Sequence, residues 1–313
     1  MNAQDEQYMR RCFQLAKLGL GHVAPNPMVG AVIVCDGKII GEGFHFKAGM
    51  GHAEVNAVNS VKNKELLKKS TIYVSLEPCA HYGKTPPCAD LIIRKAVKKC
   101  VVGCVDSFSE VSGRGIQRIK DAGIEVVVGV LEDECRELNR TFFTYHTLHR
   151  PFITLKWAQS ADGFIDCNFQ PVRISNEKTT MLAHKLRAEN DGILVGRTTL
   201  ERDKPSLTVR HWYGKEPQKF VLSSNPSEIS LPDGFTAVSS LEEMEGIQSL
   251  LVEGGAAVHK YFIDNNLWDI IRVETSAQLF HQGTKAATLP QNAVLVSEKW
   301  YDGNVIREYR PCS

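Results

Sequence analysis

The 313-residue chain has no long hydrophobic run and no block of lysine or arginine. No apolar stretch approaches the ~18 residues that indicate a membrane-spanning helix. The net charge is +1 at pH 7, so the sequence lacks the basic footprint that long nucleic acids and anionic membranes attract. These absences argue against a nucleic acid or a membrane as the partner. A small phosphorylated molecule, which needs only a local cluster of donors, stays compatible with this charge.

The sequence also lacks a secreted disulfide framework. Its nine cysteines are an odd number and are not spaced like the paired cysteines of a small extracellular domain. The N-terminal segment has neither the apolar core of a signal peptide nor an Arg- and Ser-rich transit pattern. We therefore expect a cytoplasmic protein with free thiols, some of which bind metal.

The length allows two ordinary domains, and the composition, with 43% hydrophobic and 23% charged residues, is that of a globular protein. The helical pattern breaks between His146 and Pro151, because the residue before a proline avoids helical backbone. We place the boundary there and predict domains over residues 1–147 and 148–313.

Strand-like and helix-like stretches alternate in both parts, which implies sheets covered by helices. Asp5 is the expected N-cap of the first helix, and 203–218 is expected to be a loop over a site. In the first part we predict helices over 5–18, 52–62, 88–97, 114–122 and 132–146, and strands over 29–34, 38–40, 71–76, 99–105 and 124–130. In the second we predict helices near 177–188, 241–247 and 256–266, and strands near 152–158, 192–195, 219–223, 235–239, 249–253 and 268–274, with two more within 293–309.

Residues with the chemistry of a zinc site lie in two segments of the first part. A catalytic zinc takes three protein ligands and keeps one position for water, and His52, Cys79 and Cys88 supply one imidazole and two thiolates. Glu54 lies two residues after the histidine and is suited to move protons. The signature of zinc-dependent nucleobase deaminases is H-x-E followed by P-C-x-x-C, and the chain matches it except that eight residues separate its two cysteines.

The spacing sets a geometric condition. Residues i and i+2 point roughly 200° apart on a helix, so His52 and Glu54 converge only if His52 lies at or before the first turn. Cys88 also stands where a helix is expected to begin, and helix N-termini favour the thiolate. We therefore predict that two helix N-termini point at the metal.

Each residue of this motif has a simpler reading when taken alone. A single buried histidine, or a single cysteine after a strand, is usually a packed core residue, and we assign Cys12, Cys100 and Cys104 to the core. Two other functions agree less well with the sequence. A zinc module with a purely structural role does not explain the adjacent Glu54, and the near-neutral charge argues against a nucleic-acid editing protein.

The segments 25–30 (PNPMVG), 51–54 (GHAE) and 77–88 (EPCAHYGKTPPC) resemble the deaminase domain of bifunctional riboflavin biosynthesis deaminase–reductases. The eight residues between Cys79 and Cys88 are typical of that family, whereas other deaminases have C-x-x-C. The segments 155–163 (LKWAQSADG), 196–210 (GRTTLERDKPSLTVR) and 252–256 (VEGGA) are similar to its reductase domain and follow in the same order. The resemblance therefore extends over nearly the whole chain.

The resemblance implies a cytidine-deaminase-like three-layer α/β/α domain followed by a dihydrofolate-reductase-like α/β domain. The first would deaminate 2,5-diamino-6-ribosylamino-4-pyrimidinone 5′-phosphate by zinc-dependent hydrolysis. The second would reduce the ribosyl side chain to ribityl with NADPH. A homo-oligomer acting on this small phosphoribosylated pyrimidine is expected. The alternative is a deaminase whose degenerate second domain serves packing or dimerisation.

The family also implies a role for individual residues. In the first domain it makes His52, Cys79 and Cys88 zinc ligands, Glu54 the proton shuttle, and Asn26, His45 and Lys84 substrate contacts. In the second, cofactor contacts are expected at Gln159, Arg173, Thr199, Asp203, Gly254 and Gly255. Substrate contacts there are expected at Lys156, Arg187, Leu207, Arg210 and Glu253.

The second domain departs from the family pattern in one segment. Where the family usually has Trp-Ile-Ser/Thr, the chain has Arg173-Ile174-Ser175 after Val172, and Pro171 replaces a polar substrate contact. An aromatic cofactor contact is therefore absent, and Arg173 is expected to stack on an adenine or meet a cofactor phosphate. Lys156 and Asp162 are hypothesised to help open or protonate the sugar.

Overall fold

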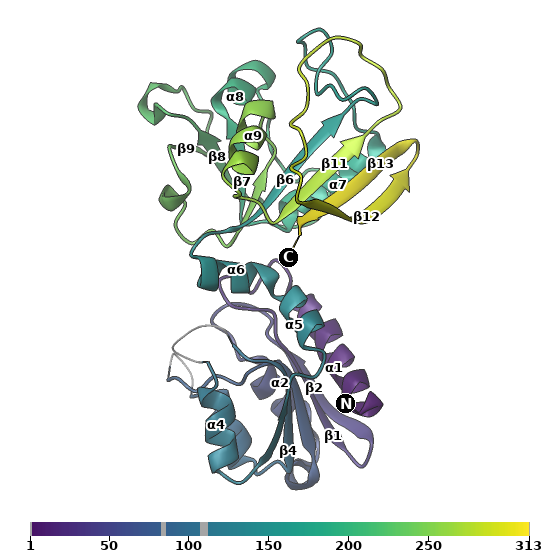
Figure 1. Ribbon diagram of the computed structural model, residues 1–313. Helices are drawn as coiled ribbons and strands as arrows, with labels where there is room; N and C mark the ends of the chain where they lie inside the picture. The colour runs from purple at the N-terminus through teal and green to yellow at the C-terminus, as the bar shows by residue number, and fades with distance from the viewer. Residues whose placement is uncertain (1, 83–85, 107–111, 313) are drawn as a thin grey trace. The chain divides into compact units, whose positions relative to one another are not determined.

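The computed structural model describes residues 2–82, 86–106 and 112–312 (Figure 1). The chain divides into two compact units, Met1–His149 and Arg150–Ser313. Each unit has its own sheet and its own hydrophobic core. Neither unit contains a described helix that is long and apolar enough to cross a bilayer.

The first unit has a five-stranded sheet in the order β2-β1-β3-β4-β5. Strand β1 is antiparallel to both neighbours, and β3, β4 and β5 are parallel. Its strands are β1 (Gly30–Cys35), β2 (Lys38–Phe44), β3 (Thr71–Leu76), β4 (Lys99–Cys104) and β5 (Glu125–Val128). Its helices are α1 (Ala3–Ala16), α2 (Ala53–Ser60), α3 (Cys88–Arg94), α4 (Arg114–Asp121), α5 (Glu132–Leu138) and α6 (Arg140–Leu148), with 3₁₀ turns at Lys17–Gly19 and Lys64–Lys69.

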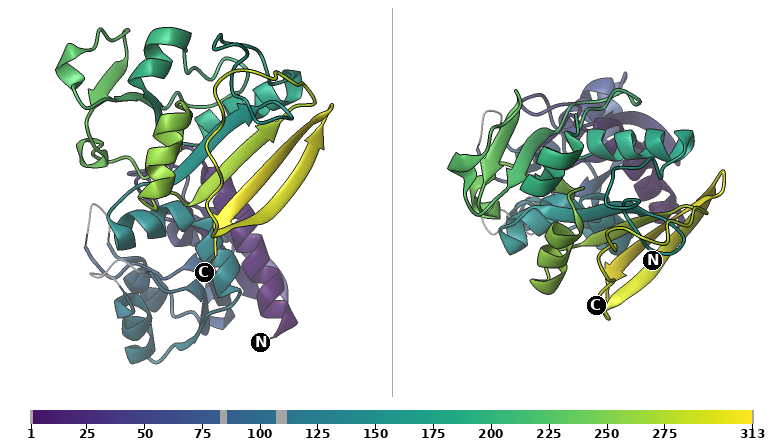
Figure 2. Two further views of the ribbon diagram at one scale, coloured as in Figure 1. Left: turned by 45° about the horizontal axis from the view of Figure 1, so that its top comes forward. Right: turned by 90° about the horizontal axis from the view of Figure 1, so that it is seen from above.

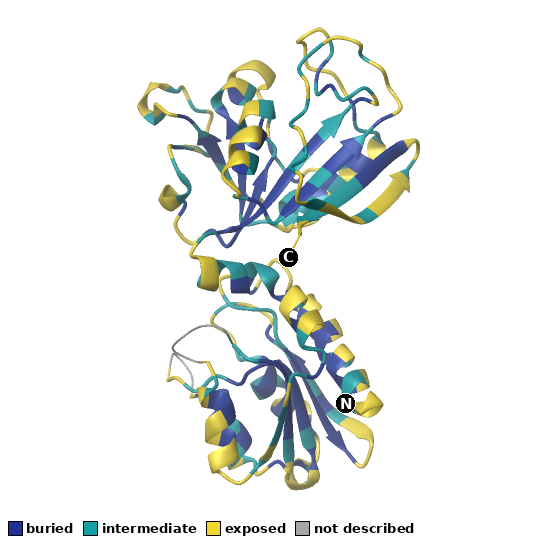
Figure 3. Ribbon diagram, in the orientation of Figure 1, coloured by how far each residue is buried: buried dark blue, intermediate teal, exposed yellow. Residues whose placement is uncertain are grey.

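Helices cover both faces of this sheet, because successive side chains of a strand point to opposite faces. Ala31 and Ile33 of β1 belong to a core shared with α2, α3 and α4, whereas Val32 and Val34 belong to a core shared with α1 and α5. Figure 3 shows the buried residues concentrated between these layers. The three-layer α/β/α arrangement is therefore confirmed.

The start of the first helix differs from the prediction. Helix α1 begins after Asn2, whose side chain accepts a hydrogen bond from Gln4 N at 3.1 Å. Asp5, the expected N-cap, lies inside the helix and accepts a hydrogen bond from the Tyr73 hydroxyl at 2.7 Å. Asn2 therefore satisfies an amide at the helix start, as an N-cap residue does.

The single helix expected over 132–146 is wrong, because Asn139 divides it into α5 and α6. The backbone of Asn139 leaves the helical region, with φ −112° and ψ 26°. Its side chain accepts from Met28 N at 2.8 Å and donates to Met28 O at 2.9 Å. Two long-range hydrogen bonds thus replace the regular helical path, and they hold α6 beside the loop that contains Asn26.

The second unit has an eight-stranded sheet in the order β12-β13-β11-β6-β10-β7-β8-β9. Strands from β11 to β9 are parallel, and the hairpin β12–β13 adds an antiparallel edge, seen in yellow in Figure 2. The strands are β6 (Phe152–Gln159), β7 (Gly192–Gly196), β8 (Gln218–Leu222), β9 (Phe235–Val238), β10 (Ser249–Val252), β11 (Ile270–Thr275), β12 (Ala293–Tyr301) and β13 (Asn304–Pro311). The helices are α7 (Glu177–Ala188), α8 (Arg197–Asp203) and α9 (Ala256–Asp264), with 3₁₀ turns at Pro226–Glu228 and Leu241–Glu243.

Two further predictions for this unit are wrong. The helix expected over 241–247 is only the 3₁₀ turn Leu241–Glu243, and Gly246 follows with φ +73°, a conformation incompatible with a right-handed helix. Helix α8 was not predicted, because its seven residues are too few to show a helical period. Thr199 and Asp203 therefore lie on a helix.

Candidate functional site

Three side chains that can bind a metal come together in the first unit. His52 is the N-cap residue of α2, Cys79 follows β3, and Cys88 is the first residue of α3. Their ligand atoms lie within 4.8 Å of one another, and His52 Nδ1 is 3.5 Å from Cys79 Sγ and 3.3 Å from Cys88 Sγ. Two helix N-termini meet at this point, which agrees with the geometry that the sequence spacing predicts.

The two sulfur atoms differ in their tendency to lose a proton. A hydrogen bond from the Cys88 thiol, assisted by His52, lowers the pKa of Cys79 to about 4 in spite of burial. Hydrogen bonding to Cys79 and burial together raise the pKa of Cys88. One imidazole and two sulfur atoms, one of them readily a thiolate, form a donor set that catalytic zinc takes. The residues present therefore fit zinc.

Glu54 lies in the first turn of α2 beside these ligands and is 3% exposed. Burial, followed by the charge of Cys79, raises the pKa of Glu54 to about 7. A carboxyl group with a pKa near the working pH both accepts and donates protons efficiently. The environment of Glu54 therefore suits a group that moves protons.

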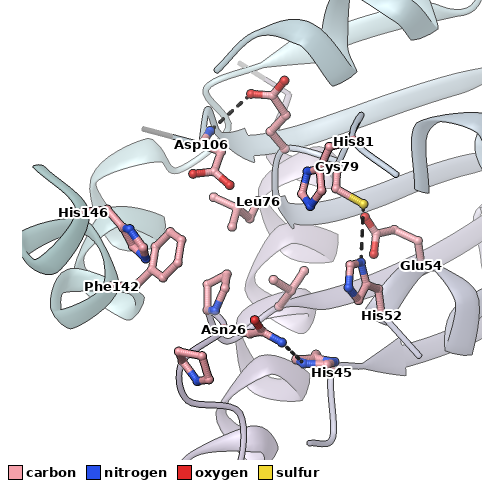
Figure 4. A pocket seen from close by; sticks show the side chains of 14 residues that line it. Asn26, His45, His52, Glu54, Leu76, Cys79, His81, Asp106, Phe142 and His146 are labelled. Atoms are coloured by element: carbon pink, nitrogen blue, oxygen red, sulfur yellow. Dashed lines mark hydrogen bonds between the residues drawn. The ribbon is translucent and has the colours of Figure 1, made fainter. Parts of the chain in front are cut away.

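These residues line a cavity of about 300 Å³ (Figure 4). The cavity is large enough for a small-molecule ligand. Its metal-side lining includes His45, His52, Glu54, Cys79 and His81, and its other side includes Pro25, Asn26, Pro27, Asp106, Phe142 and His146. The last helix of the unit, α6, contributes Phe142 and His146.

Hydrogen bonds orient the Asn26 amide toward the cavity. His45 Nδ1 lies 3.2 Å from Gly51 O, and because a carbonyl oxygen only accepts, Nδ1 carries the proton. Burial lowers the pKa of His45, so that its Nε2 accepts from Asn26 Nδ2 at 3.1 Å. The Asn26 oxygen is then left as an acceptor that faces the cavity (Figure 4).

The structure brings together most residues expected at the first site. Asn26 and His45 line the cavity, whereas Lys84 lies outside the described residues. Sequence reasoning missed Asp106, Phe142 and His146 as cavity residues. The i, i+4 spacing of Phe142 and His146, which puts both on one face of a helix, was the available signal.

A buried ion pair occupies the expected substrate site of the second unit. Arg187 of α7 contacts Glu253 through two hydrogen bonds of 2.7 and 3.0 Å, and it also donates to Thr208 O at 3.1 Å. The side chains of Arg187 and Glu253 are only 14% and 9% exposed. Burial opposes ionisation of Glu253, but the positive charges of Arg187 and Lys156 lower its pKa. Arg187 and Glu253 therefore act as one unit.

The Gly254–Gly255 turn between β10 and α9 packs closely on the end of β7. A Cβ atom at Gly254 would clash with the backbone of Val195 and Gly196, and Gly255 has φ +53°. The Thr199 hydroxyl lies 3.0 Å from the position that a Gly255 Cβ would take. A turn of this kind allows a phosphate group to approach the free amide groups at a helix N-terminus. The local backbone therefore fits the pyrophosphate of a dinucleotide cofactor.

Other expected residues have structural partners. Gln159 accepts from Trp157 Nε1 at 2.8 Å, and Arg173 is exposed and donates to Ser175 O at 3.1 Å. Asp203 accepts from Arg202 at 2.9 Å.

The loop after α8 contains the remaining expected substrate contacts. Leu207 is buried with φ +50°, which is unusual for a branched residue and typical of functional loops. Arg210 is exposed and donates to the Ser206 and Thr208 hydroxyls.

Asp162, which was hypothesised with Lys156 to help open or protonate the sugar, is held by contacts within its own loop region. Asp162 accepts hydrogen bonds from the Ser160 hydroxyl at 2.6 Å and from the backbone of Phe280 and His281 at 3.2 and 2.8 Å. Asp162 thereby fixes the loop after β11, and within residues 2–82, 86–106 and 112–312 no hydrogen bond or ion pair joins it to Lys156.

His259 of α9 makes the stability of the second unit depend on pH. It is 2% exposed, its Nε2 lies 3.1 Å from Val252 O, and burial, followed by the Lys156 charge, lowers its pKa to about 4. The unfolded chain therefore binds this proton more readily, and stability falls as the pH drops from about 6.5 to about 4. The full effect is about 3 kcal/mol.

We expect His259→Gln to reduce this pH dependence, since glutamine does not titrate. Urea unfolding at pH 7 and pH 5 measures it, with His281→Gln at an exposed loop as the control. An unchanged difference between the two pH values in His259→Gln would contradict the assignment.

Each of the two units matches a known protein family. Residues 2–104 match the family of the cytidine and deoxycytidylate deaminase zinc-binding region, and residues 151–280 match the RibD C-terminal domain. The chain is 47% identical to riboflavin biosynthesis protein RibD of Aquifex aeolicus over 220 residues, which cover 70% of the chain and 61% of the relative. It is 34% identical to RibD of Bacillus amyloliquefaciens over 307 residues, which cover 85% of the chain and 82% of the relative.

A solved structure is similar over the whole chain. The diaminohydroxyphosphoribosylaminopyrimidine deaminase/5-amino-6-(5-phosphoribosylamino)uracil reductase of Thermotoga maritima has a TM-score of 0.90 and 35% identity, with 99% of each chain covered. In the alignments with RibD of Aquifex aeolicus, Actinobacillus pleuropneumoniae and Synechocystis, the chain spans 61%, 58% and 63% of the relatives' lengths. The fold is therefore a deaminase-like domain followed by a dihydrofolate-reductase-like domain, and the chain belongs to the RibD family of riboflavin biosynthesis proteins.

Proposed function

We propose that the chain catalyses two consecutive steps of riboflavin synthesis. The first unit hydrolyses an amino group from 2,5-diamino-6-ribosylamino-4-pyrimidinone 5′-phosphate and releases ammonia. The second unit reduces the ribosyl side chain of the product to ribityl with NADPH. The observation that carries the proposal is the convergence of His52, Cys79 and Cys88 on one point of a cavity, next to the buried Glu54.

In the deaminase step, His52, Cys79 and Cys88 hold zinc, which when bound supplies Lewis-acid activation of water. Glu54 takes two protons in succession, the first from the attacking water and the second from the hydroxyl group that this water becomes, and it delivers one to the ring nitrogen and one to the departing ammonia. Its pKa of about 7 fits both halves of this transfer. Burial of Glu54 limits exchange of these protons with solvent.

Other cavity residues orient the pyrimidine. The Asn26 oxygen accepts a hydrogen bond from a ring N–H or amino group, because His45 already accepts the hydrogen of the Asn26 amide. The side of the cavity formed by Phe142 and His146 gives room for the ribosyl phosphate. Lys84, placed by its sequence position between the two cysteines, is proposed as a phosphate contact.

In the reductase step, the protein positions a hydride donor against the sugar carbon. Thr199 and the Gly254–Gly255 turn hold the cofactor, together with Gln159, Arg173 and Asp203. Lys156, Leu207, Arg210 and the Arg187–Glu253 pair contact the substrate. Since Glu253 already neutralises Arg187, Arg210 is the stronger candidate to meet the phosphate charge.

One assay separates the two activities. Zinc-loaded protein is given the diaminopyrimidinone phosphate, NADPH is added later, and ammonia release and NADPH absorbance are followed separately. We expect one ammonia and then one NADPH consumed per substrate. Ammonia without NADPH oxidation would remove the reductase assignment, and absence of ammonia would remove the deaminase assignment. A homo-oligomer in the cytoplasm also stays a prediction, and the molar mass in solution tests self-association.

A further inference from the structure

Glu77, the residue directly after β3, has four backbone amides around its carboxylate. One oxygen accepts from Gly115 N at 2.9 Å and Ile116 N at 3.3 Å, and the other accepts from Gly113 N at 2.9 Å and Asp106 N at 3.3 Å. The residue is only 4% exposed. A carboxylate accepts such a set of N–H groups without leaving any donor unpaired.

These amides come from both ends of the segment that joins β4 to α4. Two of them belong to the first turn of α4, where amides have no partner within the helix and the helix dipole favours a negative charge. The N-cap residue of α4, Gly113, provides no side chain for this purpose and has φ +75°. Glu77, at the end of β3, therefore caps the N-terminus of α4 in place of the N-cap side chain that this helix lacks.

The hydrogen bonds of Glu77 also hold the first turn of α4 against Pro78, the residue before the proposed zinc ligand Cys79. A Cβ atom at Gly115 would clash with Pro78 O, so the first turn of α4 lies directly on the residue between Glu77 and Cys79. The Glu77 backbone is also fixed, because its N–H donates to Cys104 O at 3.0 Å. The chain just before Cys79 is thus held by both main-chain and side-chain contacts.

The other side of Cys79 is held by α3. Cys88 N lies 3.3 Å from Cys79 Sγ, and Ala89 N donates to Cys79 O at 3.1 Å. The N-terminus of α3 therefore contacts Cys79 itself, whereas α4 holds the two residues before it, Glu77 and Pro78. Only the contact with α4 depends on a carboxylate.

We propose that Glu77 is a positioning residue that fixes Cys79 in its place as a metal ligand by binding the first turn of α4. The inference rests on the proposed zinc centre. Glu77 also lines the cavity, but in this role both of its carboxylate oxygens accept from backbone amides and it acts through Cys79. Loss of a residue that orients a metal ligand without touching the metal typically weakens metal binding by about 10–100-fold.

Glu77→Gln keeps the size of the side chain but replaces one oxygen by an NH₂ group, which then faces amide donors. We expect the full-length variant to bind zinc about 10–100-fold more weakly in competition with a chelator. We also expect a change in the sulfur-to-metal absorption bands of the cobalt-substituted protein. Glu65→Gln, the same substitution at an exposed position where the carboxylate pairs with Lys68, is the matched control and should leave both measurements unchanged.

Gly115→Ala provides a second test that leaves the carboxylate in place. The added methyl group pushes α4 away from Pro78 and should weaken zinc binding in the same direction. Wild-type zinc affinity and cobalt bands in both variants would overturn the proposal. So would loss of the far-UV circular dichroism of the metal-free Glu77→Gln protein, because a positioning residue leaves the fold intact. If wild-type protein binds zinc but releases no ammonia, the proposed activity fails while the zinc affinities still test the role of Glu77.

Discussion

Replacing Glu54 by glutamine is expected to lower the rate of ammonia release by about 10²–10⁴-fold, the usual contribution of a general acid–base group. Glutamine has nearly the same shape but accepts and donates no proton at neutral pH. Glu54 is buried beside the ligands and is not one of the three proposed ones, so zinc content should stay at the wild-type level. The measurements are kcat for ammonia release and the zinc content of the purified variant.

Glu65→Gln is the control for a carboxylate lost at an exposed position of the same unit. The Glu54→Gln protein should also still oxidise NADPH when it is given the deaminated intermediate directly. Ammonia release at the wild-type rate in Glu54→Gln would assign the proton transfers to another group.

Breaking the buried Arg187–Glu253 ion pair is expected to lower both the stability and the reductase activity of the second unit. Arg187→Met leaves the Glu253 carboxylate without its partner in a site where the two side chains are 14% and 9% exposed. Removal of one member of a buried pair typically costs about 3–5 kcal/mol of unfolding free energy, because the other charge stays uncompensated. We also expect loss of reductase activity, since both residues lie at the proposed substrate site. Urea unfolding and NADPH oxidation measure the two effects.

The double variant Arg187→Met/Glu253→Leu distinguishes stability from function. Replacing both members of a buried pair by apolar residues is often neutral for stability. The double variant should therefore regain much of the unfolding free energy while staying inactive as a reductase. A single variant as stable as the wild type would contradict the view that Glu253 is held ionised by Arg187.

The elements that the sequence predicts best are those with a strong period or a distinctive motif. The strand over 71–76 is found with the expected bounds, because its first four residues are β-branched or aromatic and the apolar run ends at Leu76, just before Glu77 and Pro78. The convergence of His52, Cys79 and Cys88 was also predictable, since the condition that His52 precede the first turn follows from helix geometry alone.

Features that depend on contacts distant in sequence were not predictable. The break at Asn139 arises from two hydrogen bonds to Met28, a residue more than one hundred positions away. The Arg187–Glu253 pair likewise joins α7 to the end of β10, and nothing in the local sequence of either residue indicates the other. Such contacts are made only when the fold is complete, and they decide which polar groups remain free for a ligand.

X-ray absorption at the zinc edge of the purified full-length protein tests the account most directly. The structure predicts one zinc bound by two sulfur atoms at about 2.3 Å, one imidazole nitrogen at about 2.0–2.1 Å and one further oxygen ligand. Cys79→Ser should remove one of the two sulfur neighbours. A site closed by four protein ligands, or a protein that takes up no zinc, would contradict a hydrolytic metal centre at His52, Cys79 and Cys88.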